Sequence, residues 1–335
     1  MGAEGSGFKS RCPDFHMNDS TDSLPGWTFS HRPDRGYILR GDGDNHIITS
    51  PIFRTPGDFK SLVLSVSYQP RPQEYLETEV QVCQDGEWSK FFKLAHYSDE
   101  EKYSFDEQED ENAALYVDVL QVARVAQMYR FRLTLHGQVD IPTVVVCVQP
   151  ANRESDPYAA LLPPGKCWVD IKPISQMTLP QSEEERRRLC SPTSLCMALN
   201  TLGVVIDPVT VAKGVYDSHA QIYGNWTFNM AYANTCGVNA CVAQFKRLSQ
   251  LDEYVTPNSL VLATVGYGPG ELTDAAIEQT AGHLMVICGW EQDLIRVADP
   301  AAAHADEVLR FYHADEFAQV WLKNKSGMAY LVRKK

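Results

Sequence analysis

The sequence predicts two domains, an all-β sandwich of jelly-roll type followed by an α+β domain. The chain has 335 residues, which is longer than a single hydrophobic core usually supports. Residues 26–150 are a succession of short runs rich in Val, Ile, Tyr and Phe, separated by turn signals such as PDRG and QDGE. This pattern is typical of a sandwich. Residues 167–335 begin with helical patterns and continue with strand patterns, which indicates an α+β domain.

Two short segments flank the predicted sandwich. Residues 1–25 contain no apolar run and predict a flexible leader without a signal peptide. The chain as given is therefore expected to be cytoplasmic, whereas removal of a signal peptide would make it a secreted protein. Residues 151–166 are rich in proline and predict a linker of restricted flexibility.

The composition excludes several classes of protein. A hydrophobic content of 44% with 22% charged residues is typical of a soluble globular chain. No segment approaches the roughly 18 consecutive apolar residues that a membrane-spanning helix requires. The net charge of −13 opposes nucleic-acid binding. The nine cysteines have no framework spacing and complete no zinc motif, so we expect reduced thiols and neither a metal nor an organic cofactor.

The least clear part of the sandwich is the run ALYVDVLQVARVAQMYRFRLTLHG, residues 114–137. Val119, Val122 and Ala126 also suit the 3.6-residue period of a helix. The frequency of β-branched residues favours strands, and ALYVDVLQV is predicted as one uninterrupted strand.

The first chemical feature of the second domain is Cys190, in RRRLCSPTSLCMALN. Pro192 suits the first turn of a helix that Gly203 ends, which places the Cys190 sulfur at a helix N-terminus. Free N–H groups and the helix dipole stabilise a thiolate there, so the pKa of the thiol should fall. An arbitrary cysteine is more often simply buried, and the predicted position at a helix N-terminus makes Cys190 a stronger candidate for a nucleophile than an arbitrary cysteine.

His283 and Asp299 lie at the ends of two predicted strands. GHLMVICGW predicts a buried strand that begins at His283, and DLIRVADP predicts the neighbouring antiparallel strand, which ends at Asp299. A carboxylate at that position can hold the imidazole tautomer and stabilise the imidazolium. Each residue alone is more often structural, a turn residue in the case of an Asp before Pro.

Four residues in matching contexts strengthen this interpretation. The order Gln176, Cys190, His283, Asp299, embedded in ISQM, CSPTS, GHLMV and ADPAA, resembles the bacteriocin-processing (double-glycine leader) cysteine peptidase-like family of the papain-like superfamily. The resemblance covers residues 167–335. It implies a papain-like fold, a Cys-His-Asp triad and a glutamine donor to the oxyanion, at Gln176 or alternatively at Gln181. The segment QSEEERRR before Cys190 is expected to form a surface loop or to displace the glutamine.

The substrate groove is predicted from a second resemblance. The segment NWTFNMAYANTCG is similar to one in bacterial members of this group, and Asn225 is expected to cap a helix there. Trp226 and Asn229 are the groove candidates in this helix, whereas most of its aromatic residues should lie in the core. Tyr267 and Gly268, which follow a predicted strand, are further candidates for substrate binding.

The sequence therefore predicts a cysteine peptidase that hydrolyses peptide or amide bonds of a peptide or protein substrate through an acyl-enzyme. The alternative is a noncatalytic peptide- or carbohydrate-binding protein that uses the papain-like fold as a scaffold. By analogy with other appended sandwiches, the first domain is predicted to be a recognition or packing module, with a glycan or cell-wall component as its candidate ligand.

Overall fold

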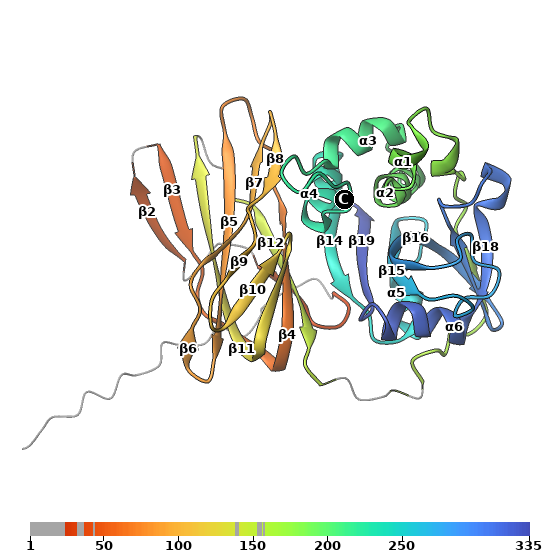
Figure 1. Ribbon diagram of the computed structural model, residues 1–335, viewed down its shortest axis with the longest axis horizontal. Helices are drawn as coiled ribbons and strands as arrows, with labels where there is room; N and C mark the ends of the chain where they lie inside the picture. The colour runs from red at the N-terminus through yellow and green to blue at the C-terminus, as the bar shows by residue number, and fades with distance from the viewer. Residues whose placement is uncertain (1–23, 32–36, 43, 138–140, 153–155, 157) are drawn as a thin grey trace, which may run out of the picture.

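A computed structural model describes residues 24–31, 37–42, 44–137, 141–152, 156 and 158–335. The leader predicted over residues 1–25 lies almost entirely outside these residues. Figure 1 shows two sheet-rich bodies side by side, the first built from strands and the second from a sheet with helices beside it. The predicted combination of a mostly β segment and a mixed α and β segment is confirmed.

The first body is one network of twelve antiparallel strands, of which seven follow the order β1-β12-β4-β11-β5-β7-β8. Its strands are β1 (Thr28–His31), β2 (Ile38–Asp42), β3 (Asn45–Thr49), β4 (Phe53–Ser67), β5 (Tyr75–Gln84), β6 (Glu87–Trp88), β7 (Phe92–Ser98), β8 (Lys102–Ser104), β9 (Gln108–Glu109), β10 (Ala113–Tyr116), β11 (Val119–His136) and β12 (Thr143–Pro150). Phe131, Leu133 and Leu135 are buried, and the residues between them are partly exposed, so the strand period of two builds the core.

The prediction for residues 114–122 is wrong in one respect. Strand is confirmed over helix, but ALYVDVLQV is not a single strand, because a two-residue turn at Val117 and Asp118 folds β10 back on β11. Val117 has a φ of 55°, a conformation that a β-branched residue adopts only under constraint. The run contains no Gly, Asn or Pro at this turn, and Asp118 alone is a weak turn signal among β-branched residues.

The second body is built on a seven-stranded antiparallel sheet with the order β14-β19-β15-β16-β17-β18, and β13 pairs with β16. Its strands are β13 (Lys166–Trp168), β14 (Val238–Gln244), β15 (Ser259–Tyr267), β16 (Thr280–Glu291), β17 (Leu294–Ala298), β18 (Leu309–His313) and β19 (Met328–Lys334). Its helices are α1 (Glu183–Arg186), α2 (Cys190–Thr201), α3 (Pro208–Val215), α4 (Trp226–Thr235), α5 (Leu251–Tyr254) and α6 (Ala314–Ala318). Short 3-10 turns are η1 (Gln176–Thr178), η2 (Leu248–Gln250) and η3 (Ala305–Glu307), and η4 (Gln319–Lys323) is a π-helical segment. The segment QSEEERRR is thus partly helical, with Ser182 capping α1.

Helix α4 lies where the two bodies meet (Figure 1). Phe228 and Ala231 belong to the buried core of the first body, whereas Met230 and Ala233 belong to that of the second. A helix that is apolar on both sides is expected to be buried on both sides. The two cores therefore share one helix.

Two further properties bear on function. Every cysteine in the described part of the chain is a free thiol. None of the described helices combines the length and apolar character that crossing a membrane requires.

Candidate active site

Cys190 is the first residue of α2, as the sequence predicted. No side chain caps this helix, so its first N–H groups stay available at the position of the sulfur. The thiol accepts hydrogen bonds from the backbone N–H groups of Ser191 and Leu284 and interacts with the side chain of His283. Cys190 itself is half-buried. The sulfur thus lies between the start of α2 and strand β16.

His283 and Asp299 form a short, buried pair. His283 lies within β16, which begins three residues earlier than predicted, and Asp299 directly follows the antiparallel neighbour β17. Nε2 of His283 is 2.7 Å from Oδ1 of Asp299. The two side chains are almost inaccessible, with 3% and 0% exposure. Because Nε2 contacts the carboxylate, the other ring nitrogen, Nδ1, remains for Cys190.

Each of the three groups shifts the pKa of its neighbour in the direction that favours the neighbour's charged form. Burial raises the pKa of Cys190, but the hydrogen bond and charge of His283, with the two backbone N–H groups, bring it below the ordinary value. Burial lowers the pKa of His283, but the charge and hydrogen bond of Asp299 and the contact with Cys190 raise it to about 10. Burial raises the pKa of Asp299, and His283 lowers it below the ordinary value. These shifts all favour a thiolate beside an imidazolium.

Asp299 is held from several directions. The backbone N–H of Ala301 donates to Oδ1 at 2.9 Å, and the phenol of Tyr312 on β18 donates to Oδ2 at 3.2 Å. Tyr267 at the end of β15 is also nearby, because the charge of Asp299 contributes, after burial, to a raised pKa of the Tyr267 phenol. Tyr267 is 5% exposed, and its hydroxyl has no hydrogen-bond partner among the described residues. Its position is therefore beside the buried carboxylate.

Gln176 begins η1 and is anchored beside the Asp299 segment, because its backbone N–H donates to the carbonyl of Pro300 at 2.8 Å. Its side-chain Nε2 donates to the carbonyl of Arg186 at 2.9 Å, and its Oε1 has no hydrogen-bond partner within the described residues. Gln181, the alternative donor, also has a buried Oε1 without a partner in the part of the chain that the structure describes. The helical turn of α1 therefore fixes one N–H of the Gln176 amide and leaves the second available.

A buried polar cluster lies behind the nucleophile. Ser191 donates to Oδ1 of Asn229 at 2.9 Å and lies 3.0 Å from the hydroxyl of Tyr330. Asn229 donates in turn to the carbonyls of Tyr223 and Asn225. Asn229 is fully buried, so in this structure it supports Ser191 and does not face a groove.

The remaining groove candidates lie at two places. Trp226 is the first residue of α4 and is half-buried, and Gly268 follows β15 with its N–H 2.7 Å from Oε2 of Glu271. Neither the cluster around Asn229 nor the contact of Tyr312 was predicted from the sequence. Serine, asparagine and tyrosine inside apolar runs carry no local signal of a partner far along the chain.

Two family models match the chain. Residues 169–328 match the peptidase C39 like family, and residues 44–148 match the peptidase C39 N-terminal domain. Residues 169–328 belong to the C39-like peptidase family. The resemblance predicted from the sequence is confirmed, and this C39-like protein is a cysteine peptidase.

Solved structures give weaker likenesses to the C39-like chain. A double-glycine motif protease from an AMS/PCAT transporter, in complex with the leader peptide, shares 14% identity over 52% of this chain and 97% of its own, with a TM-score of 0.36. A C39-like peptidase from Bacillus anthracis shares 19% over 51% and 98%, with a TM-score of 0.39. The peptidase domain of Streptococcus ComA, a bifunctional ABC transporter involved in quorum sensing, shares 13% over 50% and 99%, with a TM-score of 0.34. No curated protein matches the chain. The family assignment rests on the family models.

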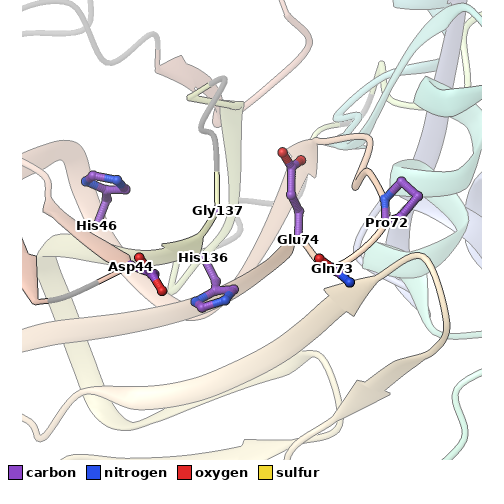
Figure 2. Close-up of a pocket in the computed structure, with 7 residues that line it drawn as sticks. All are labelled: Asp44, His46, Pro72, Gln73, Glu74, His136 and Gly137. Atoms are coloured by element: carbon purple, nitrogen blue, oxygen red, sulfur yellow. The ribbon is translucent and has the colours of Figure 1, made fainter.

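The C39-like peptidase also has an open pocket of about 360 Å³ in its first sheet (Figure 2). Asp44, His46, Glu74 and His136 contribute polar side chains to its wall. Tyr75, which follows the lining residue Glu74, stacks with His96 and with His136, with ring centroids 5.0 and 4.9 Å away. The Tyr75 ring thus stacks with two imidazole rings of the same sheet. Among the described residues, no three His, Cys, Asp or Glu side chains form a group that could hold a metal ion.

Proposed function

We propose that the chain hydrolyses peptide or amide bonds with Cys190 as nucleophile, His283 as its acid and base, and Asp299 as the residue that orients His283. The observation that carries this proposal is the continuous contact from Cys190 through His283 to Asp299, with coupled pKa values that favour the ion pair. This geometry supports a thiolate that is already formed before substrate binds.

In the first step, the thiolate of Cys190 attacks the carbonyl carbon of the substrate, and the carbonyl π electrons move to its oxygen. Collapse of this intermediate breaks the C–N bond, and the imidazolium of His283 gives its proton to the leaving amine. A thioester remains on Cys190. Neutral His283 then takes a proton from water, the hydroxide attacks the thioester, and the released acid leaves Cys190 as a thiolate beside an imidazolium.

The oxyanion of each intermediate needs donors that are already in place. The backbone N–H of Cys190 at the start of α2 is one proposed donor, supported by the uncapped helix terminus. The second N–H of the Gln176 amide is the other proposed donor, because the carbonyl of Arg186 occupies only one N–H.

Substitution Gln176→Ala should lower kcat by about 10²-fold or more, whereas Gln181→Ala should leave it nearly unchanged. The opposite result would move the role to Gln181.

The finer description of the fold is also part of this proposal. We propose that residues 167–335 form a papain-like peptidase domain, supported by a helix that starts at Cys190 and a sheet that carries His283. Residues 26–150 would form a jelly-roll-like sandwich, with 151–166 as the linker. Trp226 and Gly268 are the proposed substrate-binding residues, because Asn229 and Tyr267 are buried beside other members of the site.

The test is digestion of a proteome-derived peptide library by the full chain and by Cys190→Ala. We expect the wild type to cleave and to be labelled at Cys190 by iodoacetamide well below about pH 8. Cys190→Ala should lose both properties, and retained cleavage would overturn the mechanism. Cleavage by neither protein, with an inert Cys190, would favour the noncatalytic scaffold.

The matched control is Cys236→Ala. Cys236 is also half-buried, but it lies at the C-terminal end of α4, and burial raises the pKa of its thiol. It should neither react at neutral pH nor affect cleavage. A glycan or cell-wall ligand for the sandwich stays a prediction, and glycan-array binding by the full-length Cys190→Ala variant would test it.

A further inference from the structure

The hairpin that the sequence did not predict places one carboxylate against the second body. Val117 and Asp118 form the tip of the turn between β10 and β11, and Val117 has a φ of 55°. For a β-branched residue this conformation is strained, and it persists only where surrounding contacts determine it. The contacts at this tip are made by Asp118, which is buried.

Asp118 accepts hydrogen bonds from backbone N–H groups at the start of helix α4. The backbone N–H of Trp226, the first residue of α4, donates to Oδ2 of Asp118 at 2.5 Å, and the N–H of Thr227 is a second donor. The helix's own cap, Asn225, accepts the N–H of Phe228 instead. The first N–H groups of a helix have no partner within it, and a carboxylate there also interacts favourably with the helix dipole. Two of the first N–H groups of α4 therefore have their hydrogen-bond acceptor on a residue of the sandwich.

A second polar contact crosses at the same place. The hydroxyl of Tyr97 on β7 donates to Oγ1 of Thr227 at 3.0 Å, and the Tyr97 ring packs edge-on against Phe228. Phe228 and Ala231 complete the sandwich core. The N-terminal half of α4 is thus fixed by polar and apolar contacts from the sandwich.

The same helix turn reaches the nucleophile from its other side. Asn229 lies one residue after Phe228, and its Oδ1 accepts the hydroxyl of Ser191, the residue next to Cys190. Ser191 is 3% exposed, and its N–H is one of the donors to the Cys190 sulfur. A displacement of α4 would therefore shift Ser191 and the sulfur that it helps to hold.

We infer that the sandwich is a component of the active site and that Asp118 is a positioning residue, which holds Cys190 in place through α4, Asn229 and Ser191. This inference rests on the proposed role of Cys190. It assigns the N-terminal domain a function in the reaction itself, in addition to any recognition of ligands.

The burial of the Asp118 carboxyl group agrees with a positioning role for this residue. Burial, together with the charge of Asp217, raises the pKa of Asp118 to about 7 despite the backbone N–H groups that it accepts. Burying a carboxylate costs desolvation free energy. An apolar side chain could make a purely structural contact at this position without that cost.

The test compares three full-length variants with the wild type. Asp118→Ala removes the acceptor, whereas Asp118→Asn keeps an oxygen for Trp226. Asp110→Ala is the matched control, because Asp110 also accepts backbone N–H groups, those of Lys90, Asn112 and Ala113, but entirely within the sandwich. The measurements are kcat and KM for a peptide cleaved by the wild type, the alkylation rate of Cys190 by iodoacetamide, and Tm.

We expect Asp118→Ala to lower kcat and the alkylation rate at least about tenfold, with KM little changed, because small displacements at a reacting group are costly. Asp118→Asn should recover most of the loss, and Asp110→Ala should lower Tm without affecting Cys190. If Asp118→Ala does not fold, Tyr97→Phe should lower both rates in the same direction by a smaller factor.

Equal rates in the folded Asp118→Ala variant and the wild type would overturn the inference. So would an equal loss of Cys190 reactivity in Asp110→Ala, because this would indicate general destabilisation. Fast alkylation of wild-type Cys190 without turnover would contradict the proposed hydrolysis alone, and the alkylation rates would still decide the role of Asp118.

Discussion

The hydroxyl of Tyr312 donates a hydrogen bond to Oδ2 of Asp299 at 3.2 Å, while Oδ1 of the same carboxylate contacts His283 at 2.7 Å. Tyr312 lies on β18 and Asp299 follows β17, so pairing of these two strands brings the phenol to the carboxylate. Tyr312 is 1% exposed, so its hydrogen bond to Asp299 is shielded from bulk solvent. The orientation of His283 therefore depends on a third strand.

Substitution Tyr312→Phe tests this dependence. Loss of the donor should cost about 1 kcal/mol at Asp299 and lower kcat about fivefold, with KM unchanged. Steady-state kinetics on a cleaved peptide would measure the effect, and Tyr254→Phe is the control, because Tyr254 is a buried tyrosine that packs against Phe245. An unchanged kcat in Tyr312→Phe would contradict the dependence.

Substitution Asp299→Asn should change the pH profile. Asp299 raises the pKa of His283 to about 10, so the wild type should keep its imidazolium, and its activity, until pH approaches 10. Without the charge, the pKa of His283 falls and the alkaline limb should move toward neutral pH, with kcat lower by about 10²-fold or more. The profile of kcat/KM between pH 5 and 11 measures both changes. An alkaline limb at the same pH in both proteins would contradict this coupling.

Substitution Asp118→Asn should change how stability depends on pH. The pKa of Asp118 is about 7 in the folded protein and about 3.9 in the unfolded chain. The folded state therefore binds more protons between these values, and the free energy of unfolding should fall as pH rises from about 4 through 7. Asp118→Asn removes this contribution. Urea unfolding at pH 5 and pH 8 measures it, and a difference between the two proteins that is equal at both pH values would contradict it.

Substitution Gly214→Ala should destabilise the contact between α3 and α4. A Cβ at position 214 would lie 2.1 Å from Cε2 of Tyr232, closer than side chains can pack. Alanine stabilises a helix by about 1 kcal/mol relative to glycine. The overlap with Tyr232 should outweigh this gain and lower the free energy of unfolding by about 1–3 kcal/mol. Gly224→Ala, which meets no atom within 4 Å, is the control for chemical denaturation. A stabilised Gly214→Ala variant would contradict the packing.

Part of the fold could be predicted because its signals are local. The helix at Cys190 begins where Pro192 and the leucine spacing predicted it, and Asn225 caps α4 as expected. The turn at Val117 could not be predicted, because a valine gives no sign of a positive φ. It is held there by contacts of Asp118 with a helix more than one hundred residues away.

The sequence by itself determined the family, the separation into a strand-rich segment and a mixed segment, and the three residues proposed as the triad, because their signals lie in short contiguous motifs. Only the tertiary structure decided that Asn229 supports Ser191, that Tyr312 holds Asp299, and that α4 belongs to two cores. The physical reason is that burial and hydrogen-bond partners depend on which segments pack together. Cys190 was visible in the sequence, whereas the groups proposed to hold it in place come from strands and helices that meet only in the folded chain.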